Sequence, residues 1–201
     1  GCRFAEGIGL TVGTRGYSEV ADGASPGCRL LPGGRRLQKV SFLPMGDHTL
    51  QYYEREARSL AETYRSVDFE RVRERVVSHF VPGGRVLEIG AGSGRDASIL
   101  LSQGFDVTAI DGSRAMINQA TEHFPELEGR LMLHRLPDRL PFDSESFDSV
   151  YSMGVLMHVG AGSLAFVFTE IARMLSPGGI LAFSVNTERS GLDHNGVDNR
   201  Q

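Results

Sequence analysis

Apolar side chains recur every three or four positions between residues 50 and 67, and charged side chains fill most positions between them. This spacing predicts an amphipathic helix with one buried face. A second stretch with the same period covers residues 69–80, and Pro82-Gly83-Gly84 then interrupts it. Because proline and glycine end helices, we expect two helices before this break and a different architecture after it.

Beyond the break, short runs rich in β-branched and apolar residues alternate with longer segments of helical period. The predicted strands cover residues 85–89, 106–110, 131–136, 147–153 and 180–185. Helices are predicted over residues 97–103, 113–124 and 163–175, with Ser113 and Ser163 as N-cap residues of the last two. Such alternation builds a parallel sheet through right-handed crossovers. The sequence therefore predicts an α/β fold of about five strands: a Rossmann-like, doubly wound, mostly parallel sheet with helices on both faces.

Residues 1–44 show neither period over a sustained length, and they carry nine glycines with six basic and three acidic side chains. The rest of the chain is acidic, and Met45 is the first methionine. We therefore expect an irregular leader at 1–44, disordered or not native to the domain; a basic targeting peptide is the rival interpretation. The expected domain, 45–201, comprises N-terminal helices at 45–82, an α/β core at 83–185 and a loop or frayed tail at 186–201.

Composition narrows the possible functions without choosing among them. The 201 residues are 40% hydrophobic and 23% charged, which suits one globular domain with a core. A formal charge of −4 offers no general attraction to nucleic acid or anionic membranes, and no apolar run is long enough to span a bilayer. Cys2 and Cys28 are too few for a disulfide scaffold or a four-thiolate metal site. We expect a cytoplasmic protein without a metal, nucleic-acid or membrane partner.

Candidate chemistry starts where Glu88, an acid late in an apolar strand, precedes three glycines at alternate positions. Glycines allow a tight turn and a close approach of the backbone to a ligand. The next predicted strand leads into Asp111, and a carboxylate there can accept both hydroxyls of a ribose. These features indicate a ligand of adenosine type. Arg95 stands where a G-x-G-x-x-G dinucleotide loop requires glycine, which disfavours a nicotinamide cofactor.

The G-x-G-x-G loop resembles the first motif of the class I S-adenosylmethionine-dependent methyltransferases, (Asp/Glu)-x-Gly-x-Gly-x-Gly, here residues 88–94. The resemblance extends over roughly residues 52–185 and includes further motifs in the same order. These are Tyr52-Tyr53, Asp111-Gly112-Ser113, Leu140-Pro141-Phe142 before Phe147-Asp148, and Leu175-Ser176-Pro177-Gly178-Gly179. The chain is thus similar to the type 11/12-like members that act on small molecules.

This resemblance implies S-adenosyl-L-methionine as the cofactor. Glu88 would organise the pocket near the amino group of the cofactor, and Asp111 would bind its ribose. The implied cofactor-binding residues are Tyr53, Glu88, Gly90, Ala91, Gly92, Gly94, Asp111, Gly112, Ser113, Met116, Leu136, Pro137, Ser152 and Met153.

Some of these assignments have alternatives. Met116 suits the adenine face but equally suits core packing, and Tyr53 lies in phase with the apolar stripe of its helix. Leu136 occupies the position where the family usually has an acid that contacts the adenine amine, so backbone groups near Leu136 and Pro137 would replace it. His158 matches a histidine common in the family and is a candidate base or substrate contact, or a structural residue.

The implied activity is transfer of a methyl group to a small-molecule acceptor that the sequence does not identify. In-line displacement at a sulfonium relies on positioning and desolvation, so no conspicuous catalytic residue is required. The chain beyond residue 185 is too short for the last two of the family's seven strands, so we expect a truncated domain whose strand at 180–185 is an exposed edge. A cofactor-binding domain with weak or no activity is the alternative, and an NAD-dependent oxidoreductase is a third.

Overall fold

The computed structural model describes residues 8–12 and 47–184. The expectations about Cys2, Cys28, a domain start at Met45 and the tail at 186–201 lie outside the described residues. The helices are α1 (Asp47–Ser66), α2 (Glu70–Val77), α3 (Arg95–Ser102), α4 (Arg114–His123) and α5 (Ala161–Met174), with short 3-10 turns η1 (Pro125–Leu127) and η2 (Leu156–His158). The strands are β1 (Ile8–Val12), β2 (Arg85–Ile89), β3 (Asp106–Asp111), β4 (Leu131–Leu133), β5 (Phe147–Ser152) and β6 (Leu175–Ser184).

The strands of the described residues form one sheet in the order β1-β6-β5-β2-β3-β4. The five strands from β2 to β6 are parallel to their neighbours, and β1 pairs with β6 in the antiparallel sense. The chain starts this parallel sheet at β2, builds outwards through β3 and β4, and then crosses back to β5. This reversal lies between β2 and β5, and it confirms the predicted doubly wound, mostly parallel fold.

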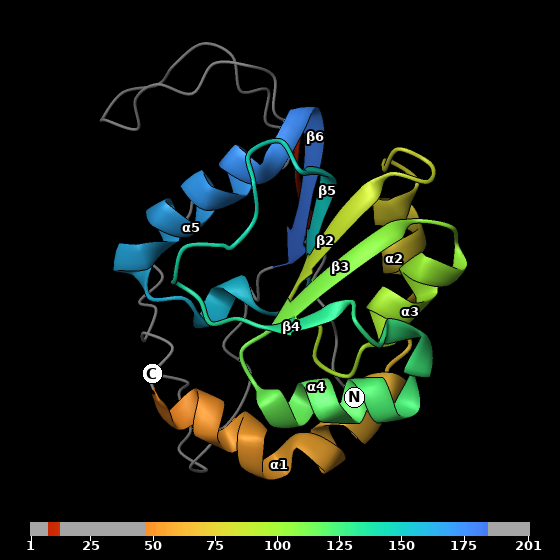
Figure 1. Ribbon diagram of the computed structural model, residues 1–201, viewed down its shortest axis with the longest axis vertical. Helices are drawn as coiled ribbons and strands as arrows, with labels where there is room; N and C mark the ends of the chain where they lie inside the picture. Colours follow the sequence, from red (N-terminus) through yellow and green to blue (C-terminus); the bar gives the residue numbers. More distant parts are fainter. Residues whose placement is uncertain (1–7, 13–46, 185–201) are drawn as a thin grey trace.

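Helices cover both faces of the sheet (Figure 1). On one face, α5 packs against a core that includes Leu87 and Ile89 of β2. On the opposite face, α2 and α3 cover a second core that includes Val86 of the same strand. The alternation along β2 follows from the period of a strand, which sends neighbouring side chains to opposite faces. Glu88 accordingly belongs to the face that α3 covers.

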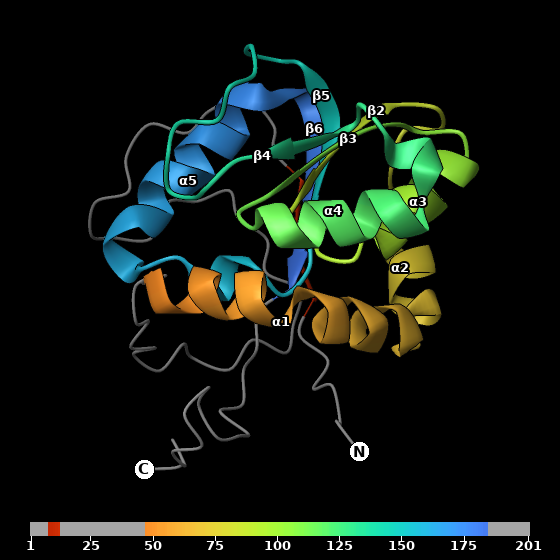
Figure 2. The ribbon, with the colours of Figure 1, turned by 60° about the horizontal axis from the view of Figure 1, so that its bottom comes forward.

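The first long helix, α1, packs against α4 and not against a face of the sheet. Both ribbon views show the two helices side by side (Figures 1 and 2). Ala57 and Ala61 of α1 meet Met116 of α4 in a small buried cluster. Small alanine side chains let the two helices approach closely, and α1 therefore becomes a covering helix beside the segments that follow β2 and β3.

The strand β1 departs from the expectation for the N-terminal stretch. Its five residues lie within the region expected to be irregular, yet they pair with β6 from Ile8 opposite Ser184 to Val12 opposite Ile180. The expectation that the strand at 180–185 is an exposed edge is therefore wrong. The five residues alternate apolar and other side chains, a signal too short to identify a strand unless the partner edge is known.

Both ends of α5 differ from their sequence-based assignments, whereas the start of α4 agrees with its assignment. Ser113 is confirmed as the N-cap of α4, since its side chain accepts a hydrogen bond from the Met116 backbone N–H at 3.2 Å. The N-cap of α5 is Gly160, however, and not Ser163. The Ser163 N–H already donates to the Gly160 carbonyl at 2.8 Å, so the helix begins before the serine is reached. At the other end α5 stops at Met174, and Leu175 begins β6.

Candidate functional site

The loop between β2 and α3 lies where the strand order reverses, at the carboxyl edge of the sheet. The backbone N–H groups of Gly90 and Ala91 both donate to the Ile110 carbonyl of β3, at 2.7 and 3.0 Å. The glycines have positive φ, and Gly94, at +77°, is also crowded by Ala120 and Leu127. The loop therefore needs glycine for its own packing, and its backbone is anchored to the neighbouring strand.

Asp111 at the end of β3 faces this loop. One carboxylate oxygen accepts a hydrogen bond from the Gly92 N–H at 2.8 Å, and the other accepts one from the Ser113 N–H at 2.8 Å. Burial raises the pKa of Asp111, while these backbone bonds oppose the rise. Because a carboxylate has about four acceptor positions, Asp111 keeps capacity for two hydroxyl groups.

Glu88 is buried in the centre of the sheet, opposite Ala109 on β3 and Tyr151 on β5. Its Oε2 atom has no hydrogen-bond partner among the residues that the structure describes. Burial raises its pKa well above the usual range, and the nearby Asp96 and Asp111 raise it further. An unpaired buried oxygen is rare in native structures and marks a position where a polar ligand group can bind.

Beside Glu88, Asp96 at the start of α3 accepts four hydrogen bonds from three residues. Arg73 of α2 donates at 3.0 Å, the neighbouring Arg95 donates to both oxygens at 3.0 and 3.1 Å, and the Tyr151 hydroxyl donates at 3.3 Å. Arg73 and Asp96 are both buried. Sequence reasoning missed this pair; the one available signal was an arginine on the buried face of a helix.

Arg95 also joins the glycine loop to the covering helix. Its remaining guanidinium nitrogen, Nη1, donates to the Tyr64 carbonyl at 2.6 Å and to the Val67 carbonyl at 2.8 Å. Carbonyls at a helix C-terminus have no partners within the helix, and a cation is favourable there. Arg95, which disfavours a dinucleotide loop in the sequence, thus holds the end of α1.

Tyr53 of α1, expected beside the cofactor, contacts Tyr64 of the same helix and His158 of η2. The Tyr53 hydroxyl lies 3.3 Å from the Tyr64 hydroxyl, and its ring packs edge-on against His158 with centroids 6.3 Å apart. Burial raises the pKa of Tyr53, so its hydroxyl stays neutral. Tyr64 and Met116 are the nearest side chains above Gly92, at 3.7 and 3.8 Å from the point where a Cβ would sit.

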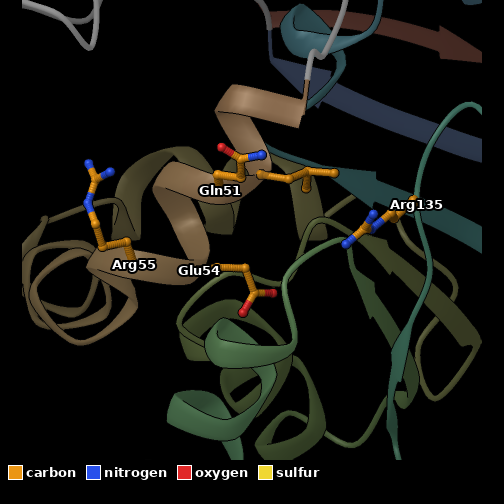
Figure 3. Close-up of a pocket in the computed structure, with 5 residues that line it drawn as sticks. Gln51, Glu54, Arg55 and Arg135 are labelled. Atoms are coloured by element: carbon orange, nitrogen blue, oxygen red, sulfur yellow. The ribbon is translucent and has the colours of Figure 1, made fainter.

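The turn between β3 and α4 contacts α1 directly. Leu50 of α1 packs on Gly112, where a Cβ would lie only 2.9 Å from the Leu50 Cδ2 atom. Beside this contact is a pocket of about 430 Å³, shown in Figure 3. Its lining residues are Leu50, Gln51, Glu54, Arg55 and Arg135. The pocket opens beside the turn that carries Asp111.

The remaining sequence candidates are placed around this edge with varied exposure. The Ser152 hydroxyl is buried and donates to the Ile89 carbonyl at 3.2 Å, which ties the ends of β5 and β2 together. Met153 packs partly buried against the core on the α3 side, whereas Leu136 is buried in the core on the α5 side. Pro137 is exposed. The proposed contacts of these residues with a cofactor stay predictions.

Two kinds of site find no support within residues 8–12 and 47–184. No group of three or more histidine, cysteine, aspartate or glutamate side chains is arranged to hold a metal ion in this part of the chain. Nor does any helix there have the length and apolar character needed to cross a membrane.

Comparison with known proteins shows which proteins share the glycine-loop motif and the fold of this chain. Residues 87–183 match the family described as a methyltransferase domain. Over 122 residues the chain is 34% identical to malonyl-[acyl-carrier protein] O-methyltransferase of Erwinia pyrifoliae, covering 58% of this chain and 44% of that one. It is 33% identical over 104 residues to ubiquinone biosynthesis O-methyltransferase of Alkalilimnicola ehrlichii, covering 51% and 41%. The chain thus spans less than half the length of these curated relatives.

Solved structures support the same assignment. The DhpI–SAM–HEP complex is 26% identical to this chain, with a TM-score of 0.56 over 71% of this chain and 67% of that one. The family match at residues 87–183 includes the glycine loop, Asp111, strands β3 to β5 and most of β2 and β6. Residues 87–183 are thus similar in sequence to a methyltransferase domain, and the chain has the fold of the class I S-adenosylmethionine-dependent methyltransferases.

Proposed function

We propose that this protein binds S-adenosyl-L-methionine at the carboxyl edge of its sheet and transfers the methyl group to a small-molecule acceptor by in-line displacement. The observation that carries the proposal is the hydrogen bond between Asp111 and Gly92, which unites the ribose-binding acid with the glycine loop. The family match and the DhpI–SAM–HEP complex support the cofactor. The names of the two curated relatives, which act in ubiquinone biosynthesis and on malonyl-[acyl-carrier protein], support an O-methyl transfer of this general kind.

The residues at this edge suit such a cofactor. The free acceptor positions of Asp111 suit the two ribose hydroxyls, and the unpaired Glu88 oxygen suits an ammonium group. When bound, the cofactor supplies a methyl group on a positively charged sulfur, which is already activated toward nucleophiles. The protein then has to place the acceptor in line and exclude water. The covering helix α1, with Tyr64 above Gly92 and Tyr53 beside Tyr64, excludes water from this edge.

His158 is our candidate for accepting a proton from the acceptor. Its ring lies against Tyr53 at the site edge, and the imidazole of histidine titrates near neutral pH. The formal charge of the chain, −4, favours a free small molecule over nucleic acid as the partner. We also propose the cytoplasm as the place of this activity.

Calorimetric titration of the full chain with S-adenosylmethionine, S-adenosylhomocysteine and NADH tests the proposal. We expect the two sulfur ligands to bind and NADH not to bind. Transfer of a labelled methyl group to pooled carboxylic, phenolic and amine acceptors then tests turnover. Binding without any transfer would support a cofactor-binding domain that lacks activity, whereas binding of NADH alone would contradict the assignment.

A further inference from the structure

The covering helix contacts the ribose-binding turn with two residues on the same side. Leu50 and Glu54 are four positions apart, and residues with this spacing share one face of a helix. Leu50 packs on Gly112, while the Glu54 carboxylate accepts hydrogen bonds from the Arg114 N–H at 2.6 Å and the Ala115 N–H at 3.2 Å. The segment that follows Asp111 is therefore held by a helix 60 residues away in the sequence.

Glu54 binds two backbone N–H groups at the N-terminus of α4. The first backbone N–H groups of a helix have no partners within the helix. Asp111 binds the Ser113 N–H and the Ser113 side chain binds the Met116 N–H, so local side chains satisfy the positions before and after Arg114 and Ala115. The carboxylate of Glu54 fills the gap, and a negative charge is favourable at this end of a helix.

Glu54 therefore acts on the same short turn as Asp111. Glu54 binds the N–H of Arg114, three residues after Asp111, and its negative charge contributes to the raised pKa of Asp111. At the opposite end of α1, Arg95 holds the carbonyls of Tyr64 and Val67. The covering helix is consequently fastened at both ends, each time to a segment that borders the cofactor site.

We infer that Glu54 is a positioning residue for cofactor binding: its carboxylate keeps α1 seated on the turn after Asp111 and so holds that turn in its binding geometry. This inference rests on the proposed function. Glu54 touches backbone amides and acts on the cofactor through Asp111 and α1. Its removal leaves the glycine loop, Glu88 and Asp111 chemically intact, so any loss of affinity reports on positioning.

The test compares Glu54→Gln and Glu54→Ala with Glu62→Ala as the matched control. Glu62 is a glutamate of the same helix whose ion pair with Arg58, at 3.6 Å, is exposed to solvent. In the ligand-free full chain, hydrogen exchange of the Arg114 and Ala115 amides should be fastest in Glu54→Ala, intermediate in Glu54→Gln and unchanged in Glu62→Ala. Calorimetry should show S-adenosylhomocysteine binding about tenfold more weakly to Glu54→Ala, with Glu54→Gln between it and the wild type.

The outcomes separate this inference from the proposed function. A purely structural role would lower the melting temperature without changing the dissociation constant of the folded protein. Wild-type affinity in both Glu54 variants, or unchanged exchange at Arg114 and Ala115, would therefore overturn the positioning role alone. Failure of the wild type to bind S-adenosylhomocysteine would instead overturn the cofactor assignment, and the inference would fall with it even if the exchange rates changed.

Discussion

Asp111 and Gly92, 19 positions apart in the sequence, are joined by a hydrogen bond of 2.8 Å between a carboxylate oxygen and a backbone N–H. The bond fixes the carboxylate beside the glycine loop and leaves acceptor positions for a ligand. It makes the end of β3 and the loop after β2 a single unit. Substitution at Asp111 therefore alters both the ligand contact and the loop.

We expect Asp111→Ala to abolish binding of S-adenosylmethionine. Ligand at about 100 times its dissociation constant stabilises a protein by about 2.7 kcal/mol, which corresponds to a rise of a few degrees in the melting temperature. The wild type should show this rise in a thermal shift assay, and the variant should show none. Asp106→Ala, at the exposed opposite end of the same strand, is the control and should keep the shift.

Glu88→Gln should change how stability depends on pH. The pKa of Glu88 is raised well above 4.5, so between 4.5 and the raised value the native state holds a proton that the unfolded chain has lost. Stability of the wild type therefore falls as the pH rises through this window, and glutamine removes the effect. Urea denaturation should give similar free energies for both proteins at pH 4 and a more stable variant at pH 8. Parallel profiles at every pH would contradict the pKa assignment.

Asp96→Ala should destabilise the protein strongly because it leaves the buried Arg73 without its anionic partner. Breaking a buried ion pair on one side costs about 3–5 kcal/mol. Asp96→Asn should lose less, since an amide oxygen still accepts one hydrogen bond. Glu56→Ala removes the exposed partner of Arg55 and should change the free energy of unfolding by no more than about 1 kcal/mol. Chemical denaturation of the three variants makes the comparison.

Gly94→Ala and Gly104→Ala separate backbone strain from crowding. Both glycines have positive φ, at +77° and +89°, where a Cβ costs about 1–2 kcal/mol. A methyl group on Gly94 would also approach Ala120 and Leu127 to 2.8 and 2.9 Å, whereas at Gly104 no described atom lies within 4 Å. Gly94→Ala should therefore lower the free energy of unfolding by about 1–3 kcal/mol more than Gly104→Ala, which is the control. Equal losses in thermal denaturation would show that the loop can relax.

Much of the fold was predictable because its signals are local. The predicted strand at residues 85–89 matches β2 in both bounds, and the predicted helix at 50–67 corresponds to α1 at Asp47–Ser66. The glycine loop and Asp111 were recognisable since turn geometry and strand ends restrict which residues can occur there. The predicted bounds of the helix at 163–175 were wrong at both ends, at Ser163 and at Leu175, because backbone hydrogen bonds competed with the local sequence signals.

The structure decided what depends on residues that are distant in the sequence. The pairing of β1 with β6 required a partner edge, and the bond between Glu54 and Arg114 spans 60 positions. No period in the sequence indicates such partners. These contacts arise only when packing brings separate elements together.

The sequence by itself determined the order of strands and helices from α1 to β6, the loop that needs glycine and the acid at the end of β3, because hydrophobic periodicity and backbone conformation act over a few residues. Only the tertiary structure decided that α1 covers this edge, that Arg73 neutralises Asp96 and that Glu88 resists ionisation. Burial and the distance between charges set these properties, and both are defined only after the chain has folded.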